Sequence, residues 1–157
     1  MSDAATDEAE EEALAARLQR WADGKATLKE VRGYTDEELH AIAKTAYFFY
    51  YQGRISEART LFQGLYAINP LDAYFAKALG VVEFAAGNGP GALAAYDVAI
   101  KLAPEDAGAY LGRAEVKLAL GQKAQAADDL KRAASYAGEG DRIKSKISAM
   151  LAANPKR

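Results

Sequence analysis

Several residue types recur through the chain at an interval of 34 residues. Gly53, Gly87 and Gly121 are separated by this interval. The same interval separates Ala58, Ala92 and Ala126; Phe62, Tyr96 and Leu130; Leu65, Ala99 and Ala133; and Pro70, Pro104 and Gly138. A fixed period of this length indicates that one small structural unit is repeated and that neighbouring units stack to bury a continuous core. The sequence therefore predicts a protein built from three stacked units.

Each unit is predicted to hold two helices joined by a tight turn. In the first unit, residues 36–53 run to a glycine and residues 54–70 end at an Asn-Pro turn. Thr35 and Glu38 have the spacing of a capping box, which satisfies backbone N–H groups at the start of a helix. Pro70 cannot continue the second helix and sets the turn into the next unit. The expected fold class is all-α, an α-solenoid.

This pattern resembles the tetratricopeptide repeat, which has small or aromatic residues in these columns and a proline near the end of each repeat. The resemblance covers residues 39 to about 138. Ala76 stands where a large aromatic residue is usual, and the third repeat ends in Gly138 without the proline. The expected organisation is an N-terminal acidic segment, helix and linker (1–34), three tetratricopeptide repeats (35–138), and a C-terminal capping helix and tail (139–157).

Both flanking segments have helical apolar patterns. Near the C-terminus, apolar residues follow Asp141, a candidate N-cap; they are Ile143, Ile147, Met150 and Leu151. This helix is expected to cover the open end of the last repeat. Near the N-terminus, Leu14, Leu18 and Trp21 form a narrow apolar stripe. The stripe must be buried either on the first repeat or on another copy of the protein.

The composition argues against several classes of function. The 157 residues carry a net charge of -2 without a basic stripe, so nucleic acid is not an expected partner. Cysteine is absent and His40 is the single histidine, so we expect neither a metal nor another cofactor. The acidic N-terminus lacks the pattern of a secretory signal, and no stretch is long and apolar enough to insert into a membrane. We expect a protein of the cytoplasm that is not an enzyme.

In the tetratricopeptide family, the first helix of each repeat lines a concave face through its second, fifth, ninth and twelfth positions. By this register the positions are His40, Ala43, Tyr47 and Tyr50; Tyr74, Lys77, Val81 and Phe84; and Gly108, Leu111, Glu115 and Leu118. The candidate residues of a peptide-binding groove are Tyr47, Tyr50, Tyr74, Lys77, Val81, Phe84, Leu111, Glu115 and Leu118. Such a face suits an extended peptide whose apolar anchors each contribute roughly 1.5–3 kcal/mol when buried. Ala43 and Tyr47 stand where a clamp for a carboxylate needs lysine and asparagine, so such a clamp is not expected.

Core packing is the alternative role for every aromatic groove candidate, because aromatic residues at helical spacing serve cores as well as binding sites. The sequence leaves both roles open for each of them. Phe48 and Phe49 are expected to pack inward, with Tyr51 near the rim of the groove. His40 is expected at the surface.

The order of elements resembles the class II chaperones of bacterial type III secretion, which guard translocator proteins. The likeness is local in "TLKEVRGYTDEELHAIA" (27–43) and in "AYFFYYQGRISEARTLFQGL" (46–65), which includes the Phe-Gln-x-Leu of their first repeat. The resemblance implies that the protein holds a hydrophobic translocator in the bacterial cytoplasm, without ATP. It also implies that the concave groove binds a segment of Pro-x-Leu-x-x-Pro type, with Tyr47 and Tyr50 at aromatic groove positions. Ala43 and Lys77 stand where the family tends to have large apolar residues, so one pocket is expected to be shallower or differently specific.

Members of this family commonly form homodimers through the N-terminal region, which would bury the stripe of Leu14, Leu18 and Trp21. A second interpretation is a structural scaffold or adaptor, in which the same repeats form a permanent subunit of a larger assembly. The regular endings "INP" and "LAP" are closer to generic repeats than to the chaperones and favour this alternative.

Overall fold

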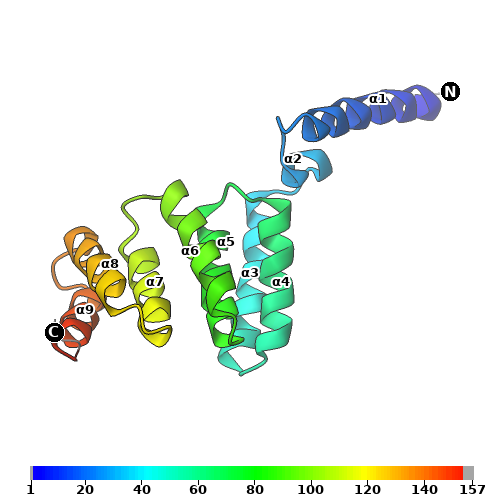
Figure 1. The fold of residues 1–157 in the computed structure, drawn as a ribbon. Helices are drawn as coiled ribbons and strands as arrows, with labels where there is room; N and C mark the ends of the chain where they lie inside the picture. The colour runs from blue at the N-terminus through cyan, green and yellow to red at the C-terminus, as the bar shows by residue number, and fades with distance from the viewer. Residues whose placement is uncertain (1, 154–157) are drawn as a thin grey trace.

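Residues 2–153, the part of the chain that the computed structural model describes, form α-helices joined by short turns, with no strand among them (Figure 1). The helices are α1 (Ser2–Ala22), α2 (Leu28–Arg32), α3 (Asp36–Tyr51), α4 (Ile55–Ile68), α5 (Ala73–Ala85), α6 (Gly89–Leu102), α7 (Ala107–Ala119), α8 (Lys123–Tyr136) and α9 (Arg142–Ala153). The predicted all-α class is confirmed. The tail expected after the last helix, residues 154–157, lies outside the described residues.

Three helix pairs, α3/α4, α5/α6 and α7/α8, pack side by side along the chain (Figure 1). The turn inside each pair holds one of the glycines spaced by 34 residues, and each adopts a left-handed backbone: φ is 75° at Gly53, 81° at Gly87 and 77° at Gly121. A residue with a Cβ pays a steric penalty in this region, whereas glycine does not. The glycine column therefore sets the turn that folds each pair back on itself.

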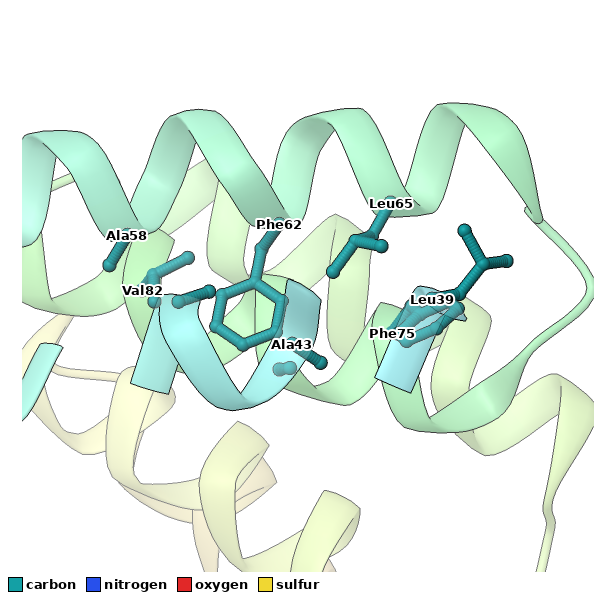
Figure 2. Close-up of a cluster of buried hydrophobic side chains, with 9 residues drawn as sticks. Leu39, Ala43, Ala58, Phe62, Leu65, Phe75 and Val82 are labelled. Atoms are coloured by element: carbon teal, nitrogen blue, oxygen red, sulfur yellow. The ribbon is translucent and has the colours of Figure 1, made fainter. Parts of the chain in front are cut away.

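The first core shows how one repeat is joined to the next. Ala58, Phe62 and Leu65 of α4 recur at helical spacing and are fully buried. In Figure 2 the Phe62 ring lies over Ala43 of α3, and Phe75 of α5 belongs to the same cluster. Burying one such side chain contributes roughly 1.5–3 kcal/mol. Because a helix of the second repeat shares this core, the repeats are stabilised by stacking.

The stack curves with the first helix of each repeat on its inner side. Helix α5 packs against α7, and α7 packs against α9. The Tyr74 ring of α5 approaches those of His40 and Tyr47 of α3, with centroid distances of 5.3 and 6.3 Å. Among the described helices, no comparable packing joins α4 to α6 or α6 to α8. The first helices of the repeats approach one another, whereas the second helices lie farther apart. Helices α3, α5 and α7 therefore line the concave face.

The two ends of the stack differ. At the C-terminal end, α9 packs on α7 and α8 and buries Ile147. At the N-terminal end, α1 extends away from the repeats and packs on α2, which in turn contacts α4 (Figure 1). Helix α2 lies in the segment expected to be a linker. Its start has a capping box between Thr27 and Glu30, a signal in the sequence that the prediction missed.

Candidate functional site

The nine groove candidates lie on α3, α5 and α7, the helices of the concave face. Eight of them are partly exposed; they are Tyr47, Tyr50, Tyr74, Lys77, Val81, Phe84, Glu115 and Leu118. Leu111 is only 7% exposed, so it offers little surface to a ligand. The structure therefore brings these residues to one face, where they are open to solvent to different degrees.

Aromatic rings cluster at the N-terminal end of this face. The Tyr47 ring lies 4.9 Å from that of Phe62 and 6.4 Å from that of Tyr50, both edge-to-face. The Tyr51 ring stacks beside Tyr47 at 6.2 Å, while His40 stacks on Tyr74. Edge-to-face and offset rings attract each other beyond the area that they bury. The cluster is therefore a preformed apolar wall and is joined to the core through Phe62.

Burial disfavours the ionisation of two phenols in this wall, those of Tyr47 and Tyr74. It raises the pKa of Tyr47, and the neighbouring phenols Tyr74, Tyr51 and Tyr50 raise it further. Burial also raises the pKa of Tyr74, with Asp72 and Tyr51 as smaller causes. Both hydroxyls stay protonated far above neutral pH, so the wall presents uncharged groups that can donate hydrogen bonds.

Two expectations for α3 are wrong. Ala43 was expected on the concave face, but it is fully buried against Phe62 (Figure 2). Phe48 was expected to pack inward, but it is 57% exposed. The cause is the helical period, since Leu39, Ala43 and Ala46 form the buried stripe and Phe48 falls on the opposite side. Phe49 is half-buried, with the Arg54 guanidinium 4.2 Å from its ring centroid.

The two charged groove candidates are both paired with residues that the sequence did not indicate. Lys77 Nζ donates to the Asp106 carboxylate at 2.7 Å, and Asp106 also accepts from the backbone N–H of Gly108 at the start of α7. Glu115 pairs with Lys146 of α9. Asp106 could have been found as an N-cap, but the contact of Lys146 depends on how α9 packs. Both charges are therefore held in place by ion pairs.

The candidate dimerisation residues are exposed along α1, with 39% exposure for Leu14, 42% for Leu18 and 47% for Trp21. Trp21 also borders a hollow of about 380 Å³ that reaches Pro70 and Leu71 at the end of α4. Leu71 is itself exposed. The hollow thus connects α1 with the edge of the first repeat, and its lining mixes apolar residues with Lys25, Thr27 and Glu30.

The described part of the chain, residues 2–153, has neither a candidate metal cluster nor a candidate membrane span. No group of three or more His, Asp or Glu side chains there could hold a metal ion. No helix within residues 2–153 is long and apolar enough to cross a bilayer.

Comparisons with known proteins agree on the fold. Residues 44–107 match the family model described as "Tetratricopeptide repeat". None of the curated protein sequences matches the chain. Among solved structures, the type III secretion translocator chaperone SycD of Yersinia enterocolitica is 23% identical with a TM-score of 0.76, over 82% of this chain and 98% of SycD.

Two further solved structures contain a bound translocator segment. SycD in complex with a peptide of the translocator YopD is 24% identical with a TM-score of 0.70, over 76% of this chain and 93% of SycD. PcrH of Pseudomonas aeruginosa, in complex with the chaperone-binding region of PopD, is 22% identical with a TM-score of 0.72, over 77% of this chain and 93% of PcrH. The chain therefore has the tetratricopeptide-repeat fold, in an arrangement similar to that of the type III secretion translocator chaperones.

Proposed function

We propose that this protein is a bacterial cytoplasmic chaperone that holds a type III secretion translocator before its export. The observation that carries the proposal is the partly exposed apolar and aromatic face of α3, α5 and α7. The similarity to SycD and PcrH, which were solved with translocator segments, supports it. The role is one of protein binding and not of enzymatic catalysis.

The groove would bind an extended client segment without ATP. The proposed contact residues are Tyr47, Tyr50, Tyr74, Lys77, Val81, Phe84, Glu115 and Leu118, with Leu111 as a mostly buried member of the same face. Tyr47 is held by Phe62, and Lys77 and Glu115 are held by ion pairs, so the face is ordered before a client arrives. Preorganisation lowers the ordering cost of binding, and apolar anchors of the client provide the free energy. Covered in this way, a membrane-inserting client is protected from aggregation.

We propose further that the protein forms a homodimer through Leu14, Leu18 and Trp21. The stripe is exposed in the single chain, and the hollow beside Trp21 reaches the exposed Leu71. Exposed apolar surface of this kind marks an interaction site. A second copy can bury it without blocking α3, α5 and α7, since α1 extends away from the repeats (Figure 1).

The groove is tested by capture of the client from the native host. The wild-type protein is expected to copurify with a large hydrophobic translocator, and Tyr47→Ala is expected to abolish the copurification. Both side chains pack against the first core, but Tyr47 is buried more deeply, so Tyr74→Ala serves as a second groove variant with less effect on packing. Phe48→Ala is the matched control, since it removes an exposed aromatic ring from the other side of α3.

Helical content and thermal midpoint are measured on every variant by circular dichroism. Loss of the client with Tyr74→Ala but not with Phe48→Ala, at unchanged helical content, supports the groove. A client retained by both groove variants contradicts it. A permanent partner bound on α4, α6 and α8 is the result expected for the alternative role as a scaffold subunit.

A further inference from the structure

Tyr96 is a residue of the outer helix α6 whose ring is inserted into the inner layer. A Cβ added to Gly80 of α5 would lie 2.9 Å from Cδ2, Cε2 and Cζ of this ring. A Cβ added to Gly112 of α7 would lie 2.4 Å from Cζ and 2.5 Å from the hydroxyl oxygen. Real Cβ atoms do not approach so closely, so these two glycines open a slot between α5 and α7. The ring fills the slot from the outer side with its hydroxyl end against α7.

The Tyr96 hydroxyl oxygen is not fully enclosed by the protein. The residue is 3% exposed. The hydroxyl has no hydrogen-bond partner within residues 2–153. Every fully buried side-chain oxygen or nitrogen in that part of the chain does have a partner. The hydroxyl oxygen is therefore not fully buried, although the ring is.

The course of the ring indicates the side on which the hydroxyl emerges, because the ring enters from the outer helix α6, passes Gly80 of α5 and ends against Gly112 of α7, both helices of the inner layer. Burial is the main cause that raises the pKa of Tyr96, and Glu115, Tyr47 and Tyr50 raise it further by their proximity. These three neighbours belong to α7 and α3 and are all candidate residues of the concave face. A residue of the outer layer thus presents a neutral hydroxyl at the floor of the groove.

We propose that the Tyr96 hydroxyl hydrogen-bonds the main chain of the client segment and holds that chain at the floor of the groove. The inference rests on the proposed function of the groove. An extended peptide presents a C=O or N–H group at every residue, and a buried amide without a partner is costly. A tyrosine hydroxyl can donate to the first group and accept from the second.

The repeat columns make this contact unique to the second repeat. The equivalent positions are Phe62 in the first repeat and Leu130 in the third, and neither side chain has a polar atom. A hydroxyl that rises from the outer layer is therefore available to the client main chain only at the second repeat. At that point it can pair with an amide of the client that burial would otherwise leave without a partner.

The experiment uses a peptide selected on the protein itself. A displayed library of random 12-residue peptides is selected on the full wild-type chain, and the best synthetic binder whose affinity falls with Tyr74→Ala becomes the probe. Tyr96→Phe removes only the hydroxyl and introduces the residue found at Phe62. It is expected to weaken the probe about three- to tenfold, the range of one net hydrogen bond, with an unchanged thermal midpoint. Tyr110→Phe, in a buried tyrosine of α7 that stacks on Tyr136, is the matched control and is expected to leave the affinity unchanged.

A second measurement separates a direct contact from a packing effect. Backbone amides of the probe are replaced one at a time by esters, which lack the N–H and accept hydrogen bonds more weakly. At one position, the ester is expected to weaken binding to the wild type but not to Tyr96→Phe. This result would show that the amide at that position and the Tyr96 hydroxyl are energetically coupled. Equal affinity of Tyr96→Phe and wild type, or additive effects at every ester, overturns the role of Tyr96 and leaves the groove intact. Failure to select any peptide sensitive to Tyr74→Ala overturns the proposed function and the role of Tyr96 with it.

Discussion

Gly112 shows how a single missing side chain sets the distance between helices. Its Cα faces the Tyr96 ring so closely that an added methyl group would overlap Cζ at 2.4 Å. Gly64 of α4 has no atom within 4 Å of its Cβ position, although it also lies inside a helix. Substitution of each glycine by alanine therefore separates the effect of helix propensity from that of steric overlap.

Gly112→Ala is expected to lower the free energy of unfolding by about 1–2 kcal/mol. Overpacking a core costs about 1–3 kcal/mol, and the gain in helix propensity of up to ~1 kcal/mol offsets part of that cost. Gly64→Ala, the matched control, keeps the propensity gain alone and is expected to raise the free energy of unfolding. Urea unfolding followed by circular dichroism measures both. Equal stabilisation by the two substitutions would show that α6 and α7 can separate freely. That result would contradict the close packing of the Tyr96 ring on Gly112.

At the same scale, the sequence assigned residues to helices more reliably than it predicted the orientation of single side chains. The repeat register correctly assigned Tyr47, Tyr74 and Lys77 to the helices of the inner layer. It could not reveal that Ala43 is enclosed by Phe62, because that burial depends on how α3 and α4 approach each other. It also could not reveal the course of the Tyr96 ring, which depends on glycines 16 residues away on either side.

Ion pairs between helices join the elements of the stack. Glu83 of α5 is buried and accepts hydrogen bonds from Arg59 and Gln63 of α4, and from Asn88 at the start of α6. Asp129 of α8 is likewise buried and is held by Arg113 and Lys117 of α7. The sequence carries no signal for these pairs, because Arg59 and Glu83 are 24 residues apart on different helices. By contrast, helical periodicity and turn residues were sufficient to predict the helices that these pairs connect.

The Glu83 network is expected to make stability dependent on acid pH. Burial by itself raises the pKa of Glu83, but the hydrogen bonds from Arg59, Asn88 and Gln63 outweigh it, and the net pKa lies below the ordinary value of 4.5. A carboxylate with a lowered pKa in the folded state contributes stability that is fully present above its unfolded pKa. That contribution is lost as the pH falls from the unfolded pKa through the lower folded one.

Glu83→Gln tests this dependence. Wild-type stability is expected to fall below about pH 4.5, where the unfolded carboxylate begins to bind protons. At pH 7 the substitution is expected to cost about 2 kcal/mol, since it replaces hydrogen bonds to a charged acceptor. Below the folded pKa the difference between the two proteins should shrink. Urea unfolding at several pH values measures it, with Glu105→Gln, an exposed glutamate before α7, as the control. A constant difference from pH 7 to pH 3 would contradict the pKa lowering.

At the scale of the whole molecule, α1 is the element that the repeats do not explain. Helix α1 spans Ser2–Ala22 and packs on α2, and every residue described from 5 to 16 is exposed. Most helical stability in proteins comes from tertiary packing, and α1 packs on the short helix α2. The sequence predicted the apolar stripe on α1. It did not predict that α1 extends away from the first repeat, because the packing on the short helix α2 sets the direction of α1 (Figure 1).

A variant with Leu14, Leu18 and Trp21 all replaced by serine is therefore expected to be monomeric, whereas the wild type is expected to sediment as a dimer. Its circular dichroism should show the loss of about one helix, since α1 then has no apolar surface to bury. Binding of the selected peptide should be retained, because the repeats do not depend on α1. Ala16→Ser places a serine on the opposite side of α1 and should leave the dimer intact. Sedimentation equilibrium over a range of concentrations measures the oligomeric state. A wild type that is monomeric throughout that range would contradict dimerisation through the stripe.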